Sequence, residues 1–328
     1  MKEAEHSTTP IPCPLCGGFN DYILARSGYP GIKVINVICR ECGLVRINPR
    51  PSHSWYERFY KEEFFNYLDP YNRPAYIEEL EQTKNENYIT PTKKFILPFI
   101  RDYIPRNGNV LDIGAGFGQT LYLIKKEKNA NVVGVEPDPY SRQIASQQIG
   151  IELLEYGVDE FLIKNKSEFD FIILSQTFEH LLDPLSILKN LARILKKDGV
   201  IFVGVPNTYN PLVPINLFFQ IAHTFNYTPY TMKKFADYAG LKIIRMKNPR
   251  TEPGLEVLLA HKKSLYSEIP KADLEIGSDW KEVVSILRRK KLWNVTRGAV
   301  KRVFNLFFGK HFTEKIKTIV DQIINYRY

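Results

Sequence analysis

Long apolar runs and dispersed cysteines are both missing from this chain of 328 residues. No apolar run approaches the roughly 18 residues that a membrane-spanning helix requires. The densest runs, 169–174 and 200–205, have the length of strands. The first residues, Met1 to His6, include acids where a signal peptide needs a basic start and an apolar core. We therefore expect a soluble, cytoplasmic protein.

The composition also excludes wholesale disorder. Hydrophobic residues make up 44% of the chain and charged residues 25%, as in an ordinary globular protein. At roughly 100–200 residues per domain, the length predicts two units or one large domain with appendages.

Positive charge is unevenly distributed along the chain. The net charge is +9, and residues 281–328 contain 12 Lys and Arg but only three acids. Residues 1–280 therefore carry no net charge, because they contain equal numbers of basic and acidic side chains. Any affinity for an anionic surface is expected in the C-terminal segment.

The four cysteines form one pattern near the N-terminus. Two residues separate Cys13 from Cys16 and Cys39 from Cys42, and a glycine follows each pair. Four thiolates from two such knuckles suit tetrahedral zinc, and the strand-like stretch 32–38 between them is typical of a zinc ribbon. Two disulfides are the alternative, but nothing in the chain indicates secretion. We expect a structural zinc ion, because four protein ligands leave no open position.

Beyond the cysteines the residue composition and hydrophobic pattern of the sequence change twice. After the connector Asn48-Pro-Arg-Pro51, residues 52–104 are rich in aromatic and charged side chains, and helices are expected over 54–65 and 74–87. From Asn109 onward, apolar strands alternate with helical stretches, which predicts a mostly parallel sheet covered on both faces. The expected strands are 110–113, 131–136, 151–154, 169–174, 200–205, 241–246 and 255–261.

One connecting helix has marked end signals. Asp183 can cap it, Pro184 occupies its first position, and apolar residues recur at helical spacing through Leu195. The pair Lys196-Lys197 then complements the C-terminal dipole before Gly199 ends the helix.

A glycine-rich turn follows the first strand of this region. Gly114, Gly116 and Gly118 permit a tight turn and the close approach of a ligand, a spacing shared by nicotinamide enzymes and nucleoside-binding transferases. Asp112 would repel a diphosphate, but it suits the cationic amino group of an amino-acid-bearing nucleoside. Glu136 closes the second strand, at the interval where an acid can bind both ribose hydroxyls.

Four stretches together carry a family resemblance. They are Asp112-Ile-Gly-Ala-Gly-Phe-Gly118, Glu136, the strand 169–174 followed by Phe178-Glu-His-Leu-Leu-Asp-Pro184, and Arg193-Ile-Leu-Lys-Lys-Asp-Gly199. With them, residues 105–263 resemble a class I S-adenosylmethionine-dependent methyltransferase. The resemblance implies an α/β fold with a Rossmann-like seven-stranded sheet.

The N-terminal pattern adds a second resemblance. Cys39-Arg-Glu-Cys-Gly-Leu-Val45 followed by Asn48-Pro-Arg-Pro51 is similar to bacterial and archaeal methyltransferases with a zinc-binding N-terminal segment. Those proteins are often assigned to the modification of sugars, polysaccharides or natural products. The implied division of the chain is a zinc ribbon at 1–50, a helical cap or lid at 51–104, the methyltransferase domain at 105–263 and a basic helical tail at 264–328.

The same resemblance implies which residues bind S-adenosylmethionine. They lie in the glycine turn and at the ends of the second and fourth strands: Asp112, Gly114, Gly116, Gly118, Glu136, Pro137, Ser175 and Gln176.

Methyl transfer is an in-line displacement, so the protein must align the nucleophile, exclude water and, for a hydroxyl acceptor, remove a proton. A base is expected where the fourth strand ends, which favours His180 with Glu179 beside it. His223 is a second candidate, and a hydrogen-bonded structural role is the alternative for either histidine. Residues 175–178 lack the Pro-Pro-aromatic turn that grips the exocyclic amine of a base.

These patterns predict methylation of an oxygen, less readily a nitrogen, of a sugar, nucleotide-sugar or lipid-linked glycan intermediate. The alternative is an RNA methyltransferase that uses the ribbon and the basic tail. Residues 1–50 contain only six Lys and Arg, so nucleic acid is a disfavoured partner. Asp112 disfavours a nicotinamide oxidoreductase, and the intact glycines and acids disfavour a non-catalytic scaffold.

The tail itself has an amphipathic pattern. From Leu292 to Phe307, apolar residues recur at helical spacing beside Arg297, Lys301 and Arg302. Such a face can pack on the protein or on a second subunit. It can also lie in an anionic headgroup layer. We therefore expect either packing or a peripheral contact of residues 286–312 with the inner face of the membrane.

Overall fold

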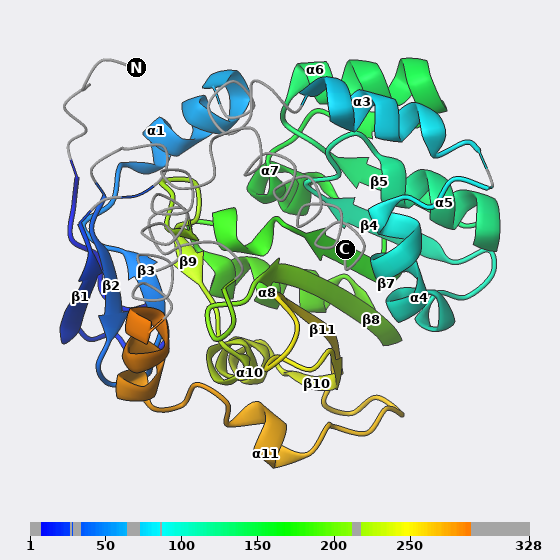
Figure 1. The fold of residues 1–328 in the computed structure, drawn as a ribbon. Helices are drawn as coiled ribbons and strands as arrows, with labels where there is room; N and C mark the ends of the chain where they lie inside the picture. The colour runs from blue at the N-terminus through cyan, green and yellow to red at the C-terminus, as the bar shows by residue number, and fades with distance from the viewer. Residues whose placement is uncertain are drawn as a thin grey trace, which may run out of the picture.

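Two β-sheets organise the residues that the computed structural model describes, namely 8–26, 28, 34–63, 73–85, 87–211 and 218–289 (Figure 1). The larger sheet has the strand order β10 (Leu241–Met246), β11 (Gly254–His261), β8 (Leu195–Pro206), β7 (Phe169–Ser175), β4 (Asn109–Ile113), β5 (Asn131–Val135) and β6 (Leu153–Leu154). Among these strands, β11 pairs antiparallel with β10 and β8, and the other neighbouring pairs are parallel. The predicted Rossmann-like seven-stranded sheet is confirmed.

Helices cover both faces of this sheet, because its strands alternate their apolar side chains between two cores. Val110 of β4 joins the core that contains α3 (Arg73–Gln82), α4 (Leu97–Ile100) and α5 (Gln119–Lys128). Its neighbours Leu111 and Ile113 join the opposite core. That core contains α7 (Val158–Lys164), α8 (Pro184–Arg193) and α10 (Pro229–Tyr238).

The C-terminal end of α8 differs from the prediction. Asp183 caps the helix by accepting from the Ser186 amide, as expected, but the helix ends at Arg193. The predicted role of Lys196-Lys197 at the helix end is wrong, since β8 has begun by then and Lys196 Nζ lies 2.8 Å from the Asp170 carboxylate. Phe169 pairs with Leu195 at the start of β7, and this pairing draws the chain into the sheet earlier than its helical periodicity suggests.

Other boundaries shift by a few residues. The strand expected at 151–154 has two residues, and the helix expected at 74–87 ends at Gln82. The helix expected at 54–65 consists of α1 (His53–Arg58) and a π-helical turn, Phe59–Glu63, after which the described residues stop. The remaining helical segments are 92–96, 101–103, α6 (Pro139–Ile144), 145–149, 178–180, α11 (Lys271–Leu274) and 280–289.

The smaller sheet joins the N-terminal region to the rest of the molecule. Its order is β1 (Asp21–Ala25), β2 (Asn36–Cys39), β3 (Val45–Ile47) and β9 (Phe225–Asn226), and the strands are antiparallel. The strand β9 belongs to the loop that follows β8, so the ribbon's sheet is completed from outside residues 1–50. The four domain boundaries proposed from the sequence stay predictions.

The helix at 280–289 packs against the ribbon (Figure 1). Val283, Val284 and Leu287 share a buried cluster with residues of β2 and β3, and the Trp280 ring lies 5.6 Å from that of Tyr22. Residues 292–307 lie outside the described residues, as does the predicted membrane contact at 286–312 except for its first four residues. Within the described part of the chain, no helix has the length and apolar character needed to cross a bilayer.

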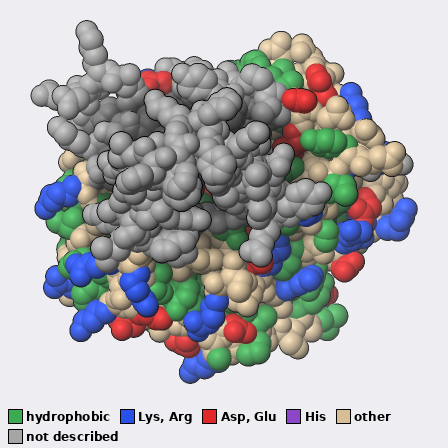
Figure 2. Space-filling model, in the orientation of Figure 1, with side chains coloured by type: hydrophobic (Ala, Val, Ile, Leu, Met, Phe, Trp, Pro, Cys, Tyr) green, Lys and Arg blue, Asp and Glu red, His purple; other side chains and the backbone are tan. Residues whose placement is uncertain are grey.

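On the face drawn in Figure 2, basic and acidic side chains of the described residues are interspersed rather than sorted by sign. This distribution agrees with the balanced charge of residues 1–280.

Candidate functional site

A cavity of about 740 Å³ opens at the carboxyl ends of β4, β5 and β7. Ligands of open α/β sheets bind at this edge, where the strands end and the loops diverge. Its wall includes residues of the glycine turn, of the ends of β5 and β7, of α1 and of the segment 155–160.

The glycine turn has the backbone conformation that the sequence predicts. Gly114, Gly116 and Gly118 have φ values of 70°, 53° and 71°, in the left-handed region that favours glycine. A Cβ on Gly114 would lie 2.5 Å from the Thr177 hydroxyl, so a side chain there is excluded. A Cβ on Gly116 would meet no atom within 4 Å, so this turn exposes bare backbone at the start of α5.

Glu136 is buried at the end of β5 and holds the turn in place. One carboxylate oxygen accepts from the Gly116 amide at 2.8 Å and the other from the Asp138 amide at 2.9 Å. Burial raises the pKa of Glu136 to about 7, although these two amides and Arg142 oppose the shift. Its side chain can accept further hydrogen bonds, because a carboxylate has about four acceptor positions.

Asp112 lies next to Glu136 in the interior of the sheet. Its Oδ1 atom is buried and has no hydrogen-bond partner among the described residues. Burial, and to a lesser degree the charge of Glu136, holds the pKa of Asp112 well above its ordinary value. A buried carboxylate without a donor is costly unless a ligand supplies one.

The other predicted cofactor residues surround the same edge. Gln176 lines the cavity, and its backbone has a left-handed conformation with φ of 54°. Its backbone N–H donates to the Gly204 carbonyl at 2.7 Å. Pro137 also lines the cavity, as do Gly114 and Glu136. Ser175 is the last residue of β7, directly before Gln176.

The three predicted catalytic residues form one cluster, although the sequence suggested His180 and His223 as alternatives. Glu179 and His180 lie in the 3₁₀ turn after β7, and His223 lies in the loop before β9. The rings of His180 and His223 are 5.1 Å apart, and one donor atom from each of the three side chains lies within 4.8 Å of the others. His180 lines the cavity, while Glu179 and His223 are buried behind it.

Burial keeps the members of this cluster away from their ordinary charge states. It raises the pKa of Glu179 to about 8 and lowers the pKa of His180 to about 4. The pKa of His223 is lowered well below its usual value by burial and by the neighbouring His180. Both imidazoles are therefore neutral near pH 7.

Hydrogen bonds fix the cluster from behind. His180 Nδ1 lies 2.9 Å from the Ala222 carbonyl, which can only accept, so Nδ1 carries the proton and Nε2 the lone pair. The Thr224 hydroxyl bonds the carbonyls of Glu179 and Leu181, and so ties the 3₁₀ turn to the loop that carries His223.

The helical cap contributes aromatic residues to this arrangement, as the prediction of a cap or lid at 51–104 implies, but their hydrogen-bond partners were not predicted. Tyr56 and Tyr60 line the cavity, and their hydroxyls donate to the carbonyls of Ile221 and Ala222 at 2.9 and 2.8 Å. The aromatic richness of 52–104 is the only sequence signal for these contacts, and it does not identify the partners.

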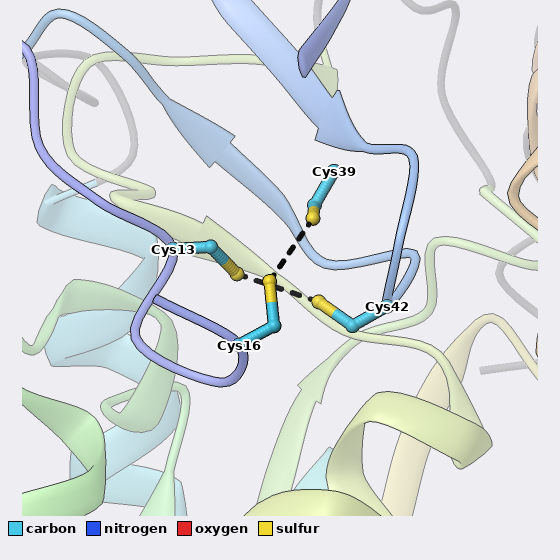
Figure 3. Close-up of side chains that lie close together, drawn as sticks. All are labelled: Cys13, Cys16, Cys39 and Cys42. Carbon is cyan, nitrogen blue, oxygen red and sulfur yellow. Dashed lines mark hydrogen bonds between the residues drawn. The ribbon is translucent and has the colours of Figure 1, made fainter. Parts of the chain in front are cut away.

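The four cysteines gather at a second site in the ribbon, where their side chains point toward one another (Figure 3). Cys13, Cys39 and Cys42 belong to the core cluster that also contains residues of α8 and α10. The sulfurs of Cys13 and Cys42 are 3.4 Å apart, as are those of Cys16 and Cys39, and all four donors lie within 4.8 Å of one another. These distances exceed the disulfide length of about 2.05 Å, and all four thiols are free. Four sulfurs about a centre at about 2.3 Å would be roughly 3.8 Å apart, so the cluster could hold a tetrahedral metal.

The comparisons with known proteins match the central part of the chain. A family model described as a methyltransferase domain matches residues 84–245. A ubiquinone biosynthesis O-methyltransferase of Actinobacillus pleuropneumoniae is 32% identical over 126 residues, which cover 34% of this chain and 53% of that protein. The corresponding protein of Histophilus somni is 34% identical over 107 residues, covering 30% and 44%. The chain thus spans about half the length of the curated relatives it matches.

Among solved structures, the chain is similar to a TehB-like S-adenosylmethionine-dependent methyltransferase from Corynebacterium glutamicum. The identity is 19%, the match covers 58% of this chain and 100% of that one, and the TM-score is 0.42. The family match, the strand order and the glycine turn agree with one another. The matched residues 84–245 therefore belong to a class I S-adenosylmethionine-dependent methyltransferase domain, and its sheet continues into β11 beyond the match.

Proposed function

We propose that this protein transfers a methyl group from S-adenosylmethionine to a hydroxyl oxygen of a small, polar acceptor, with a sugar or nucleotide-sugar hydroxyl as the preferred class. The observation that carries the proposal is the cluster of Glu179, His180 and His223, of which His180 lines the cavity on the sheet edge. S-adenosylmethionine, when bound, supplies a methyl group on a positively charged sulfur.

The residues at the sheet edge fit this cofactor. The partnerless Oδ1 of Asp112 suits the cofactor's ammonium group, and Glu136 suits its ribose hydroxyls. Gly116 leaves room for close approach to the backbone, and Gly118 begins α5. We assign Gly114, Pro137, Ser175 and Gln176 to the same pocket, with Gln176 toward the methionine end.

The acceptor would occupy the part of the cavity beneath the cap. Tyr56 and Tyr60 are on this wall and suit the apolar face of a sugar ring, and His180 of the cluster lines the same space. We propose that Glu179, His180 and His223 activate the acceptor hydroxyl. The ubiquinone-pathway relatives are named O-methyltransferases, which supports oxygen as the methylated atom.

We also propose that Cys13, Cys16, Cys39 and Cys42 hold a structural zinc ion. The support is the grouping of four free thiols within 4.8 Å. Two turn glycines, Gly17 and Gly43, have positive φ values of 75° and 74° and close the knuckles.

The test begins with calorimetric titration of the protein with S-adenosylhomocysteine and, as a control, with NAD. Methyl transfer from a labelled cofactor is then screened against nucleotide-sugars, free sugars, catechols and a generic RNA. Binding of S-adenosylhomocysteine and labelling of a sugar hydroxyl would support the proposal. Labelling of catechols would revise the acceptor, labelling of RNA would favour the alternative function, and failure to bind the cofactor would overturn the proposal.

A further inference from the structure

The cluster of Glu179, His180 and His223 beside the cavity groups three potential metal ligands, whereas removal of a proton needs only one base. Glu179 is only 1% exposed, and neither of its carboxylate oxygens has a hydrogen-bond partner from another described residue. His223 is 8% exposed, and its Nδ1 atom likewise lacks a partner among the described residues. Burying such groups without donors costs free energy, which a bound cation would recover.

We propose that Glu179, His180 and His223 bind one divalent cation, which presents its remaining coordination positions to the acceptor. Donor atoms from the three side chains lie within 4.8 Å of one another, so a single ion can reach all of them. One carboxylate and two imidazoles are the donor set of catalytic zinc sites and of sites for open-coordinate transition metals. The ligands come from two loops that the hydrogen bonds of Thr224 hold together.

The surroundings of His180 match those of a metal ligand. A histidine that binds a metal through one ring nitrogen commonly donates the other N–H to a backbone carbonyl, which fixes its tautomer and orientation. Here Nδ1 donates to the Ala222 carbonyl, so that Nε2 is the coordinating atom in the proposed site. The Tyr60 hydroxyl, in the cap, donates to that same carbonyl at 2.8 Å and so helps to hold the carbonyl in place.

The position of the site indicates what the cation does. His180 lines the cavity, whereas Glu179 and His223 lie behind it, so the open side of the ion faces the acceptor space. A hydroxyl bound there would be polarised and its pKa lowered, and its proton would leave to water in the cavity. This step deepens the proposed function and rests on it for the identity of the acceptor group, while binding of the ion itself does not depend on it.

The test uses Mn²⁺ alone, because carboxylate and imidazole donors accept it while thiolates favour softer metals. Protein with its cysteine site loaded with zinc is titrated with Mn²⁺, and the free ion is followed by electron paramagnetic resonance. We expect one Mn²⁺ per chain, bound more than about tenfold more weakly by Glu179→Gln and by His223→Gln. Glu57→Gln, which removes an exposed carboxylate on the same cavity wall, should bind Mn²⁺ like the wild type.

A second measurement needs no variant. In NMR spectra of the wild-type protein, Mn²⁺ should broaden the ring signals of His180 and His223 before those of His261, which lies at the opposite end of the sheet. Stoichiometric binding with selective broadening supports the site. No binding, equal broadening, or wild-type affinity in both Gln variants would overturn it. Titration with S-adenosylhomocysteine on the same samples separates this result from a failure of the proposed function.

Discussion

The two donor clusters of this protein are built in opposite ways. The cysteine cluster comes from two knuckles, each of which places two thiols around one tight turn closed by a glycine with positive φ. The cluster of Glu179, His180 and His223 joins a 3₁₀ turn after β7 to a loop before β9, two segments that no local spacing relates. A cluster made by local turns is visible in the sequence, whereas one made by loop packing is not.

The two clusters are nevertheless mechanically connected. The strand β9 follows His223 by two residues and pairs with β3, which begins three residues after Cys42. The Ile47 amide also donates to the Thr224 carbonyl at 3.1 Å. The ribbon therefore supports the loop that carries His223, and perturbing one cluster can be used to measure its effect on the other.

The largest effect is expected from Cys39→Ser. Metal binding to cysteine sites contributes about 10–16 kcal/mol in small zinc domains, so loss of one ligand should unfold the ribbon and sharply reduce soluble yield. Any folded fraction should keep its affinity for S-adenosylhomocysteine, since Glu136 and the glycine turn lie on the other sheet. Zinc stoichiometry by mass spectrometry and the melting temperature measure this effect. Glu41→Gln, inside the same knuckle, is the control, and a zinc-free wild type with normal stability would contradict the prediction.

The next effect concerns the second cluster alone. His180→Ala should lower turnover of the identified acceptor by roughly 10²-fold or more, because it removes a group that activates the hydroxyl. Affinity for S-adenosylhomocysteine should change little, since His180 is not among the residues assigned to the cofactor. Steady-state kinetics and calorimetry on the same preparation provide both values. A normal kcat would show that the cluster has a structural role only.

Glu136→Ala should weaken binding of S-adenosylhomocysteine more than tenfold, since a hydrogen bond to a charged group contributes about 1.5–3 kcal/mol. The variant also removes the acceptor of the Gly116 amide, which loosens the glycine turn. Glu155→Ala, at an exposed carboxylate on the same wall, should bind normally. Equal affinities in the two variants would remove Glu136 from the cofactor site.

The pH dependence of cofactor binding should report on the same carboxylate. Burial raises the pKa of Glu136 to about 7, although hydrogen bonds from the Asp138 and Gly116 amides lower it. Because the ionised form is the stronger acceptor, affinity for S-adenosylhomocysteine should fall as the pH decreases from 8 to 6, by about tenfold at most. In Glu136→Gln this dependence should flatten. An unchanged slope would assign the titration to another group, of which Asp112 is the nearest.

The smallest effect is expected from Tyr60→Phe, which removes the hydroxyl that connects the cap to the Ala222 carbonyl. One such hydrogen bond contributes about 0.5–1.5 kcal/mol to the free energy of unfolding. Chemical denaturation should detect this loss, and hydrogen exchange should increase in the loop around His223. A matching change at Tyr103→Phe, whose ring packs on Tyr266 away from the cavity, would mean that the effect is not specific to the cluster.

Much of the architecture follows from local sequence signals. Strands such as 241–246, the cap of α8 at Asp183 and the glycine turn at 114–118 all agree with the predictions. The predicted end of α8 was wrong, because pairing between Phe169 and Leu195 outweighs the helical periodicity of the preceding residues. Strand boundaries depend on such partners, which sequence spacing does not reveal.

The sequence by itself determined the alternation of strands and helices after residue 109, the glycine turn at 114–118, and the pairing of four cysteines into two knuckles. Each of these depends on neighbours within a few residues, through backbone conformation or side-chain periodicity. Only the tertiary structure decided that His180 and His223 share one site with Glu179, and that β9 completes the ribbon's sheet. Those contacts join segments far apart in the chain, and they are selected by the burial of whole loops rather than by any local pattern.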